Sequence, residues 1–179
     1  MGSFFSSIYE MFSDYKNIKI VFLGLPNAGK TTILYLLKIG EVIKSIPTIS
    51  FNKEEIKDKN VRFEAWDLAG SDNSINYWKY YIQGANAIIY VVDASDEKKH
   101  LKSKEILHST LKIMESEEVI IAILSNKHDL VGCVKYPEFV KNFELNKIKK
   151  KWQVFETNKD DTEGYFEAMQ WIKENIKKE

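Results

Sequence analysis

One stretch of eight residues constrains the fold of this chain more than any other. It fits the pattern G-x-x-x-x-G-K-[ST] at every fixed position and reads Gly24-Leu25-Pro26-Asn27-Ala28-Gly29-Lys30-Thr31. The β-branched and aromatic run before it, residues 18–23, predicts a buried strand, and residues 31–39 after it predict a helix that ends at Gly40. A strand, a glycine-rich turn and a helix start aim backbone N–H groups and the positive end of a helix at one point. A phosphate chain is the natural occupant, with Lys30 reaching its β- and γ-phosphates and the Thr31 hydroxyl bound to Mg²⁺. The alternative for the motif alone is a chance glycine-rich turn.

Size and composition are those of a single globular domain. The 179 residues are enough for one full core. Lys+Arg and Asp+Glu both number 26, so the net charge is zero, which argues against nucleic acid as the main partner because phosphate-backbone binding needs a basic footprint. Cys133 is the only cysteine, so no internal disulfide can form, and no apolar run approaches the length of a transmembrane helix. We expect a cytoplasmic monomer.

The first 16 residues combine a lipidation pattern with an amphipathic period. Residues 1–6 fit the N-myristoylation pattern M-G-x-x-x-[ST], in which Gly2 carries the acyl chain. Apolar side chains then recur at helical spacing, which predicts an amphipathic helix: Phe4, Ile8, Met11 or Phe12, and Tyr15. One myristoyl chain binds membrane only marginally, with an association constant of about 10⁴ M⁻¹, so a second apolar element such as this helix is needed for stable attachment. The alternative is a helix that simply packs on the domain, and the protein could alternate between the two.

Two neighbouring strands are predicted over residues 51–57 and 61–66. Alternation along the second strand separates one face, Val61, Phe63 and Ala65, from the other, Arg62, Glu64 and Trp66. Phe51 and Trp66 then stand as large aromatics on otherwise charged faces, which indicates a surface for a protein partner. The alternative is that both side chains lie under a loop.

A D-x-x-G motif follows the second of these strands directly. It reads Asp67-Leu68-Ala69-Gly70. Asp67 would place a carboxylate near Mg²⁺, and the backbone N–H of Gly70 can approach a γ-phosphate closely.

A second nucleotide motif follows the apolar run of residues 119–124. It reads Asn126-Lys127-His128-Asp129 and fits N-K-x-D at the carboxyl end of a predicted strand, where open α/β sheets bind ligands. An aspartate carboxylate can accept hydrogen bonds from both the N1–H and the 2-amino group of guanine, whereas adenine offers no such donor pair. The alternative is a polar turn after a strand.

The remaining segments alternate between strand and helix patterns. Residues 87–93 and 152–155 predict strands, whereas residues 96–114, a segment beginning with residues 137–143, and the final segment to residue 176 predict helices. This alternation predicts an α/β fold with a doubly wound sheet.

Together these motifs resemble the ADP-ribosylation factor (Arf) and Arf-like family of small GTPases over nearly the whole chain. The marks that carry the resemblance are Gly2 with its amphipathic N-terminus, Gly24-Leu25-x-Asn27-Ala28-Gly29-Lys30-Thr31-Thr32, Ile46-Pro47-Thr48-Ile49, Trp66-Asp67, Trp78 and Asn126-Lys127-x-Asp129. The resemblance implies an N-terminal helix over residues 1–16 and one GTPase domain over residues 17–179. That domain would hold a mostly parallel six-stranded sheet with one antiparallel strand and helices on both faces.

The resemblance also implies a role for each matching residue. Residues expected to bind GTP or GDP are Gly24, Leu25, Asn27, Ala28, Gly29, Lys30, Thr31, Thr32, Thr48, Gly70, Asn126, Lys127, Asp129, Asn158 and Lys159. Residues expected to hold Mg²⁺ are Thr31, Thr48 and, through water, Asp67. Phe51, Trp66 and Tyr81 match the aromatic triad that meets effectors. Thr48, Gly70 and the residue at position 71 are the expected catalytic positions.

The family's cycle supplies the expected partners and location. With GDP the N-terminal helix would lie on the protein, and with GTP it would be expelled to the membrane, so nucleotide state would control attachment. Exchange factors, GTPase activators and effectors are implied partners. The resemblance further implies reversible association with the Golgi or another endomembrane and a role in vesicle trafficking.

The chain departs from the family pattern at four places. Ser71 stands where the family has the glutamine that orients the attacking water, and serine is too short to do the same. Ala69 replaces a glycine, Pro26 replaces an aspartate and removes a backbone donor, and Asn158-Lys159 replaces a pair of small residues.

The sequence leaves three hypotheses for the activity of this protein. We expect GTP binding with slow intrinsic hydrolysis, which an activator's arginine finger could accelerate by about 10³- to 10⁵-fold. Asp72 or His128 could instead orient the water. The alternative is a GTP-loaded binding module that hardly hydrolyses, and a third reading, an ATP-using enzyme, is disfavoured by Asn126-Lys127-x-Asp129.

Overall fold

The computed structural model describes residues 10–15, 18–39, 53–58, 61–66, 80, 82–115 and 118–176. Several residues singled out by the sequence lie outside this part of the chain: Gly2, Thr48, Phe51, Asp67, Gly70, Ser71, Asp72 and Tyr81. Trp66 is described as a strand position, without its side chain.

A single sheet forms the centre of the described chain. Its strands are β1 (Ile18–Leu23), β2 (Lys53–Asp58), β3 (Val61–Trp66), β4 (Ala87–Asp93), β5 (Ile120–Asn126) and β6 (Trp152–Glu156). They lie in the order β2-β3-β1-β4-β5-β6, with β2 antiparallel to β3 and each other neighbouring pair parallel. The chain therefore winds outward in both directions from β1 and β4, and the predicted α/β class with a doubly wound sheet is confirmed. The point where the winding reverses is where such sheets bind ligands.

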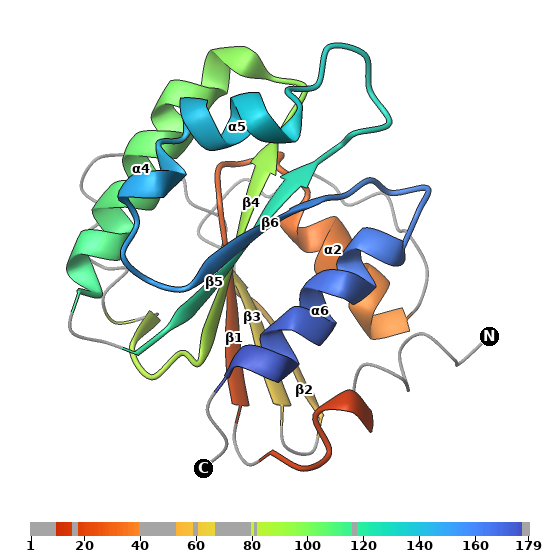
Figure 1. Cartoon of the computed structure of the whole chain (residues 1–179). Helices are drawn as coiled ribbons and strands as arrows, with labels where there is room; N and C mark the ends of the chain where they lie inside the picture. Colours follow the sequence, from red (N-terminus) through yellow and green to blue (C-terminus); the bar gives the residue numbers. More distant parts are fainter. Residues whose placement is uncertain are drawn as a thin grey trace.

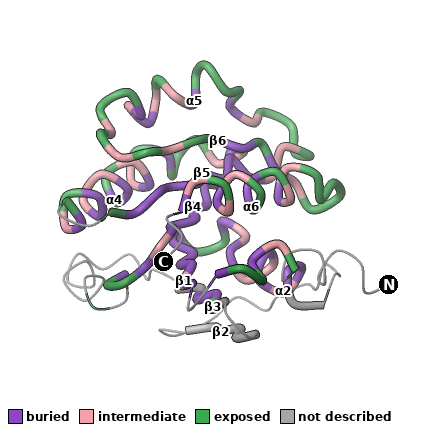
Figure 2. Tube along the Cα trace, turned by 60° about the horizontal axis from the view of Figure 1, so that its bottom comes forward, coloured by how far each residue is buried: buried purple, intermediate pink, exposed green. Residues whose placement is uncertain are grey.

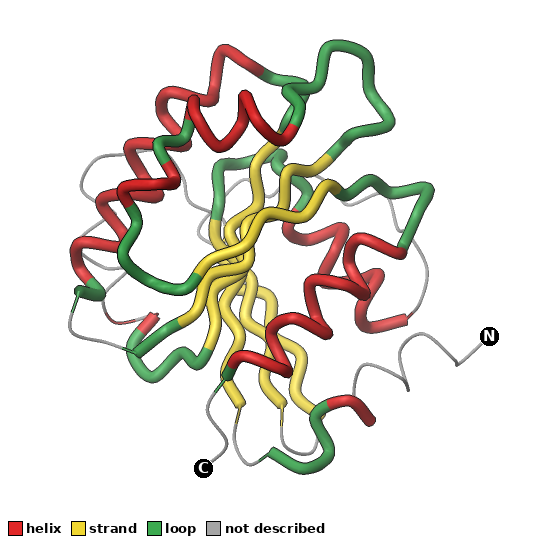
Figure 3. Tube along the Cα trace, viewed as in Figure 1, coloured by secondary structure: helices red, strands yellow, loops and turns green. Residues whose placement is uncertain are grey.

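Helices cover both faces of the sheet (Figure 1). They are α2 (Lys30–Ile39), α4 (His100–Ile113), α5 (Tyr136–Asn142) and α6 (Glu163–Asn175), with single 3₁₀ turns at Glu97–Lys99 and Leu145–Lys147. Figure 3 shows α2 and α6 on one side of the strands and α4 and α5 on the other. The predicted helix over residues 96–114 thus begins with a 3₁₀ turn, because the N–H of Lys99 bonds the carbonyl of Asp96 at 3.0 Å.

The central strands are apolar on both faces because both faces are covered. Ile20 and Phe22 of β1 belong to the core under α2 and α6, whereas Val21 and Leu23 belong to the core under α4 and α5. Figure 2 shows the consequence, with buried strands between helices whose outer surfaces are exposed. This two-sided burial holds the carboxyl ends of β1, β4 and β5 in fixed register.

Glu64 on β3 departs from the prediction of a charged, solvent-facing strand surface. Its residue is only 3% exposed. β3 lies between β2 and β1, and Glu64 has neighbours in register on both strands, Glu55 and Val21. Lys19 and Arg62 supply its counter-charges, each with a nitrogen 3.6 Å from a carboxylate oxygen. The expectation that this strand face is exposed is therefore wrong at Glu64. The nearby cations offset part of the free-energy cost of burying its charge.

Residues 10–15 lead into the sheet and pack on α6. Residues 10–11 are helical and residues 12–14 form a turn. Phe12 and Tyr15 are buried in the core that α2 and α6 share, and the Tyr15 hydroxyl donates to the carbonyl of Lys173 at 2.7 Å. The predicted amphipathic helix is thus described only at its last residues, where it packs on the domain.

Candidate functional site

The glycine-rich turn joins β1 to α2 as a loop with three positive φ angles. Gly24 has a φ of 141°, Asn27 of 66° and Gly29 of 107°. Glycine adopts such angles without steric cost, and asparagine tolerates the left-handed region better than most residues. A Cβ on Gly24 would lie 2.2 Å from the carbonyl oxygen of Val91 on β4. The loop therefore runs directly against the central strand, at the point where the winding of the sheet reverses.

The Lys30 side chain is hydrogen-bonded to the backbone of this loop. The residue is 2% exposed, and its ammonium donates to the carbonyls of Gly24 and Leu25, each at 2.9 Å. Lys30 is also the first residue of α2, whose first turn holds no acidic side chain. The half-buried Thr31 and Thr32 follow in that turn. A cation, the N–H groups of a helix start and two hydroxyls thus meet at one place, which favours a bound anion.

Asn126 joins the glycine-rich loop of residues 24–29, the predicted phosphate loop, to the loop after β6 and to α6. Its side-chain Nδ2 donates to the carbonyl of Ala28 at 2.9 Å. Its Oδ1 accepts from the Thr157 hydroxyl at 3.0 Å and from the Tyr165 hydroxyl at 2.9 Å. A Cβ on Gly29 would lie 2.4 Å from the same Nδ2, so only glycine leaves room for the contact.

Asn126 therefore has a positioning role that its motif does not reveal. It is the last residue of β5, two residues beyond the strand end that the apolar run predicts, and it is 4% exposed. Burial also raises the pKa of its partner Tyr165 to about 12, although a hydrogen bond to Thr157 opposes the shift. The phenol stays protonated at neutral pH and donates to Asn126. A buried hydrogen-bond network of this kind fixes the geometry of the segments it joins.

Lys127 and Asp93 form an ion pair across the ends of β4 and β5. The Lys127 ammonium lies 2.6 Å from Asp93 Oδ2, and Lys127 has a φ of 68°. Ser95 donates to the other oxygen, Asp93 Oδ1, through its N–H and its hydroxyl. Burial raises the pKa of Asp93, but these bonds outweigh it and hold that pKa below its ordinary value. Sequence reasoning missed Asp93, and the available signal was a carboxylate that directly follows an apolar strand.

Asp129 lies beside the loop after β6. The Lys159 ammonium is 2.9 Å from Asp129 Oδ2, and this hydrogen bond lowers the pKa of the carboxyl. The backbone N–H of His128 donates to the carbonyl of Thr157 at 3.1 Å and holds the two loops together. Asn158 accepts from two backbone N–H groups of its own loop.

The His128 side chain is bound within this corner of the protein. Its Nε2 lies 2.9 Å from the Ser125 hydroxyl, and its Nδ1 lies 3.5 Å from Cys133 Sγ and 3.7 Å from a carboxylate oxygen of Glu156. Burial lowers the pKa of the imidazole. These contacts hold the ring within the N-K-x-D segment and give it a structural role there.

Three groups of predicted residues thus meet at one edge of the sheet: residues 24–32, residues 126–129, and Asn158 with Lys159. Of Trp66 only the strand position is described, and the other predicted positions, Thr48, Asp67, Gly70, Ser71, Phe51 and Tyr81, lie outside what the structure describes. Of the predicted Mg²⁺ ligands, Thr31 alone falls within it, and a hydroxyl oxygen at a helix start suits this hard cation. Among the described residues, no three His, Cys, Asp or Glu side chains gather as a metal site.

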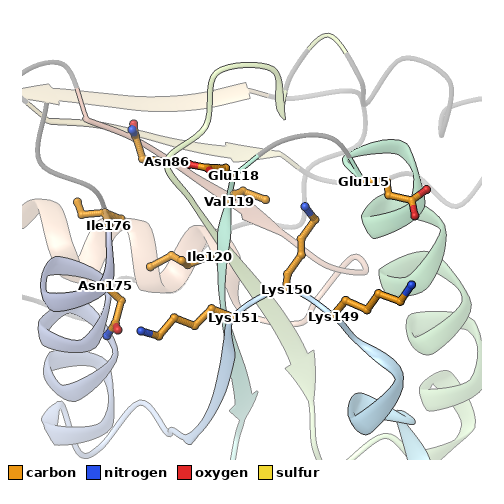
Figure 4. A pocket seen from close by; sticks show the side chains of 10 residues that line it. All are labelled: Asn86, Glu115, Glu118, Val119, Ile120, Lys149, Lys150, Lys151, Asn175 and Ile176. Carbon is orange, nitrogen blue, oxygen red and sulfur yellow. The ribbon is translucent and has the colours of Figure 1, made fainter.

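A cavity of about 460 Å³ opens at the opposite end of the strands (Figure 4). It is lined by residues just before β4, β5 and β6 and by the end of α6: Asn86, Glu115, Glu118, Val119, Ile120, Lys149, Lys150, Lys151, Asn175 and Ile176. Its lysines and glutamates carry both signs of charge, and it is separate from the edge where the predicted site residues meet.

Within the described part of the chain, every helix is too short or too polar to cross a membrane.

Comparison with known proteins agrees with the geometry. The model of the Arf family, described as the ADP-ribosylation factor family, matches residues 4–176. ADP-ribosylation factor 1 of Brassica rapa subsp. pekinensis and ADP-ribosylation factor 3 of Arabidopsis thaliana are each 39% identical over 178 residues, which cover 99% of this chain and 98% of the relative. ADP-ribosylation factor-like protein 1 of Caenorhabditis elegans is 39% identical over 173 residues, 96% of each chain. The chain therefore belongs to the ADP-ribosylation factor family, whose members are small GTP-binding proteins.

Proposed function

We propose that this protein is a switch that alternates between GTP and GDP, associates reversibly with membranes and recruits effector proteins. The observation that carries the proposal is the network around Asn126, which joins the phosphate loop at Ala28 to the loop of Thr157. That network sets the spacing between the place for a phosphate and the place for a base. A guanine nucleotide has a phosphate chain at one end and the donor pair for Asp129 at the other.

Each part of the nucleotide has a matching group. Lys30 and the start of α2 would take the β- and γ-phosphates. Thr31, Thr48 and, through water, Asp67 would hold Mg²⁺, which would supply positive charge beside the phosphates. Asp129 reads the base, and Asn126 positions the loops that surround it. Phe51, Trp66 and Tyr81 form the effector surface. We further propose a place in vesicle trafficking at the Golgi or another endomembrane, which membership of the family supports.

Ser71 sets the expected rate of hydrolysis. Its side chain ends one atom beyond Cβ, so it cannot hold a water where a glutamine would. We expect the wild type to hydrolyse bound GTP slowly, and Ser71→Gln to hydrolyse it about 10-fold faster or more, since a positioned water-orienting group is worth one or more orders of magnitude. Single-turnover hydrolysis of GTP by the purified protein with Mg²⁺ measures both rates.

Ser71→Ala is the matched control and should be as slow as the wild type. If the wild type hydrolyses GTP as fast as Ser71→Gln, another group such as Asp72 orients the water and our interpretation of Ser71 is wrong. If the wild type is inert under all conditions, including with an activator, the protein is a long-lived GTP-bound module that acts as an effector scaffold.

Membrane attachment is proposed to need both Gly2 and the apolar face of residues 1–16. Acylation alone is too weak for stable binding. Gly2→Ala protein made in a cell that carries out N-myristoylation should therefore lose co-flotation with lipid vesicles, whereas Ser3→Ala should float as the wild type does. Equal flotation of Gly2→Ala and wild type would exclude acyl anchoring.

A further inference from the structure

The base-recognition carboxylate of this chain is already paired with a cation. The Lys159 ammonium lies 2.9 Å from Asp129 Oδ2 and 2.8 Å from Asp160 Oδ2. Lys159 comes from the loop after β6 and Asp129 from the loop after β5, so the contact bridges two loops of the candidate site. The family pattern has a small residue at position 159, whose side chain could not reach Asp129.

Hydrogen bonds within its loop hold the backbone around Lys159 in place, so the contact with Asp129 depends on the conformation of that loop. The Asn158 side chain accepts from the N–H groups of Asp160 and Asp161 at 2.9 and 2.8 Å. The carbonyl of Thr157 accepts from the N–H of His128 one residue before Asp129. The hydrogen bond between His128 and Thr157 therefore keeps the backbone of Lys159 close to Asp129.

Guanine needs both oxygens of this carboxylate. One oxygen accepts from N1–H and the other from the 2-amino group. The ammonium of Lys159 already donates to Asp129 Oδ2. A base N–H group would have to share that oxygen with Lys159 or displace it, which weakens the hydrogen bond to the base.

We propose that Lys159 competes with the guanine base for the carboxylate of Asp129 and thereby weakens guanine-nucleotide binding and base discrimination. This inference rests on the proposed function, because it takes Asp129 as the group that reads the base. Lys159 acts here as a specificity-determining residue. Hypoxanthine lacks the 2-amino group and needs only one of the two oxygens, so it suffers less from the competition than guanine does.

Asp160 moderates the competition because it shares the same ammonium. Lys159 is 54% exposed and Asp160 is 69% exposed, so both contacts are of the surface type. Surface ion pairs change an equilibrium by up to about 5-fold and weaken as salt screens them. The hydrogen bond from Lys159 also holds the pKa of Asp129 low, so the carboxylate stays ionised throughout the neutral range.

Lys159→Met tests the proposal, because it keeps a long stem and removes the charge. GDP and IDP, the hypoxanthine nucleotide, are titrated separately against fluorescent GDP on the full-length protein. We expect Lys159→Met to bind GDP about 2- to 5-fold more tightly than the wild type and to gain less for IDP. The difference between the two proteins should shrink in high salt.

Asp160→Asn provides a test of opposite sign. Without its second carboxylate partner, Lys159 pairs more fully with Asp129, so GDP should bind more weakly than to the wild type. Lys147→Met is the matched control. The Lys147 ammonium lies 2.6 Å from a carboxylate oxygen of Glu144, outside the candidate site. This substitution should leave the affinities for GDP and IDP unchanged.

The outcomes separate this proposal from the proposed function. If Lys159→Met binds GDP as the wild type does, or more weakly because the ammonium attracts the nucleotide, the competition is refuted while guanine binding stands. If the wild type binds ADP as well as GDP, the proposed function fails and the competition fails with it.

Discussion

Replacing Asp129 by asparagine should lower the affinity for GDP by about 10²- to 10⁴-fold. The carboxylate would accept two hydrogen bonds from the base, and hydrogen bonds to a charged group contribute about 1.5 to 3 kcal/mol each. An asparagine offers one acceptor and one donor, so it can satisfy only one of the two base groups and turns an N–H toward the other. Titration of the variant and the wild type with fluorescent GDP measures the loss.

A xanthine nucleotide is the control for this variant. Xanthine carries a carbonyl where guanine has its 2-amino group, so the asparagine N–H has an acceptor again. The variant should therefore prefer XDP to GDP, which a protein that had merely unfolded would not do. An Asp129→Asn protein that binds GDP as the wild type does would remove Asp129 from base recognition.

Gly24→Ala should destabilise the fold by about 3 to 5 kcal/mol, the combined cost of a strained φ and of overpacking. Gly24 has a φ of 141°, and its Cβ would lie 2.2 Å from the carbonyl oxygen of Val91. Val91 cannot move away, because it is buried in β4 and pairs with Leu124 of β5. Urea denaturation measures the free energy of unfolding, and the midpoint should fall while the slope stays the same.

Gly84→Ala is the matched control for strain without a clash. Gly84 also has a positive φ, of 71°, but nothing lies within 4 Å of the position that its Cβ would take. Its cost should be about 1 to 2 kcal/mol, the penalty of a left-handed residue alone. Equal destabilisation by the two substitutions would show that the contact with Val91 contributes nothing.

The phosphate loop could be predicted from the sequence because its determinants are local. Strand, turn and helix follow one another within residues 18–39, and each has its own pattern of residue types. The parallel sheet was predictable for a related reason, since strands buried on both faces are apolar throughout. Both features depend on neighbours along the chain.

The end of β5 and the state of Glu64 could not be predicted in this way. β5 continues through the polar Ser125 and Asn126 because Asn126 pairs in register with Asp93 of β4. Glu64 is buried and lies beside Lys19 of β1, a contact between strands that alternation along one strand does not reveal.

The contacts that organise the candidate site join residues far apart in the chain. Asn126 bonds Ala28, which lies 98 residues away, and Lys159 reaches Asp129 across 30 residues. The N-K-x-D pattern marks Asn126 as a residue near the base, but its buried bonds show that it also fixes the phosphate loop. Lys159 was expected among the nucleotide-binding residues, and the structure shows that its side chain is bonded to Asp129.

The measurement that tests the central claim most directly is the affinity of the purified wild type for GDP and for ADP, each titrated against fluorescent GDP with Mg²⁺. Adenine presents no N1–H and no 2-amino group to Asp129, and a site built for such donors rejects the analogue that lacks them by about 10³-fold or more. We predict a preference for GDP of at least that size. Equal affinity for the two nucleotides would contradict base recognition by Asp129 and, with it, the assignment of this protein as a guanine-nucleotide switch.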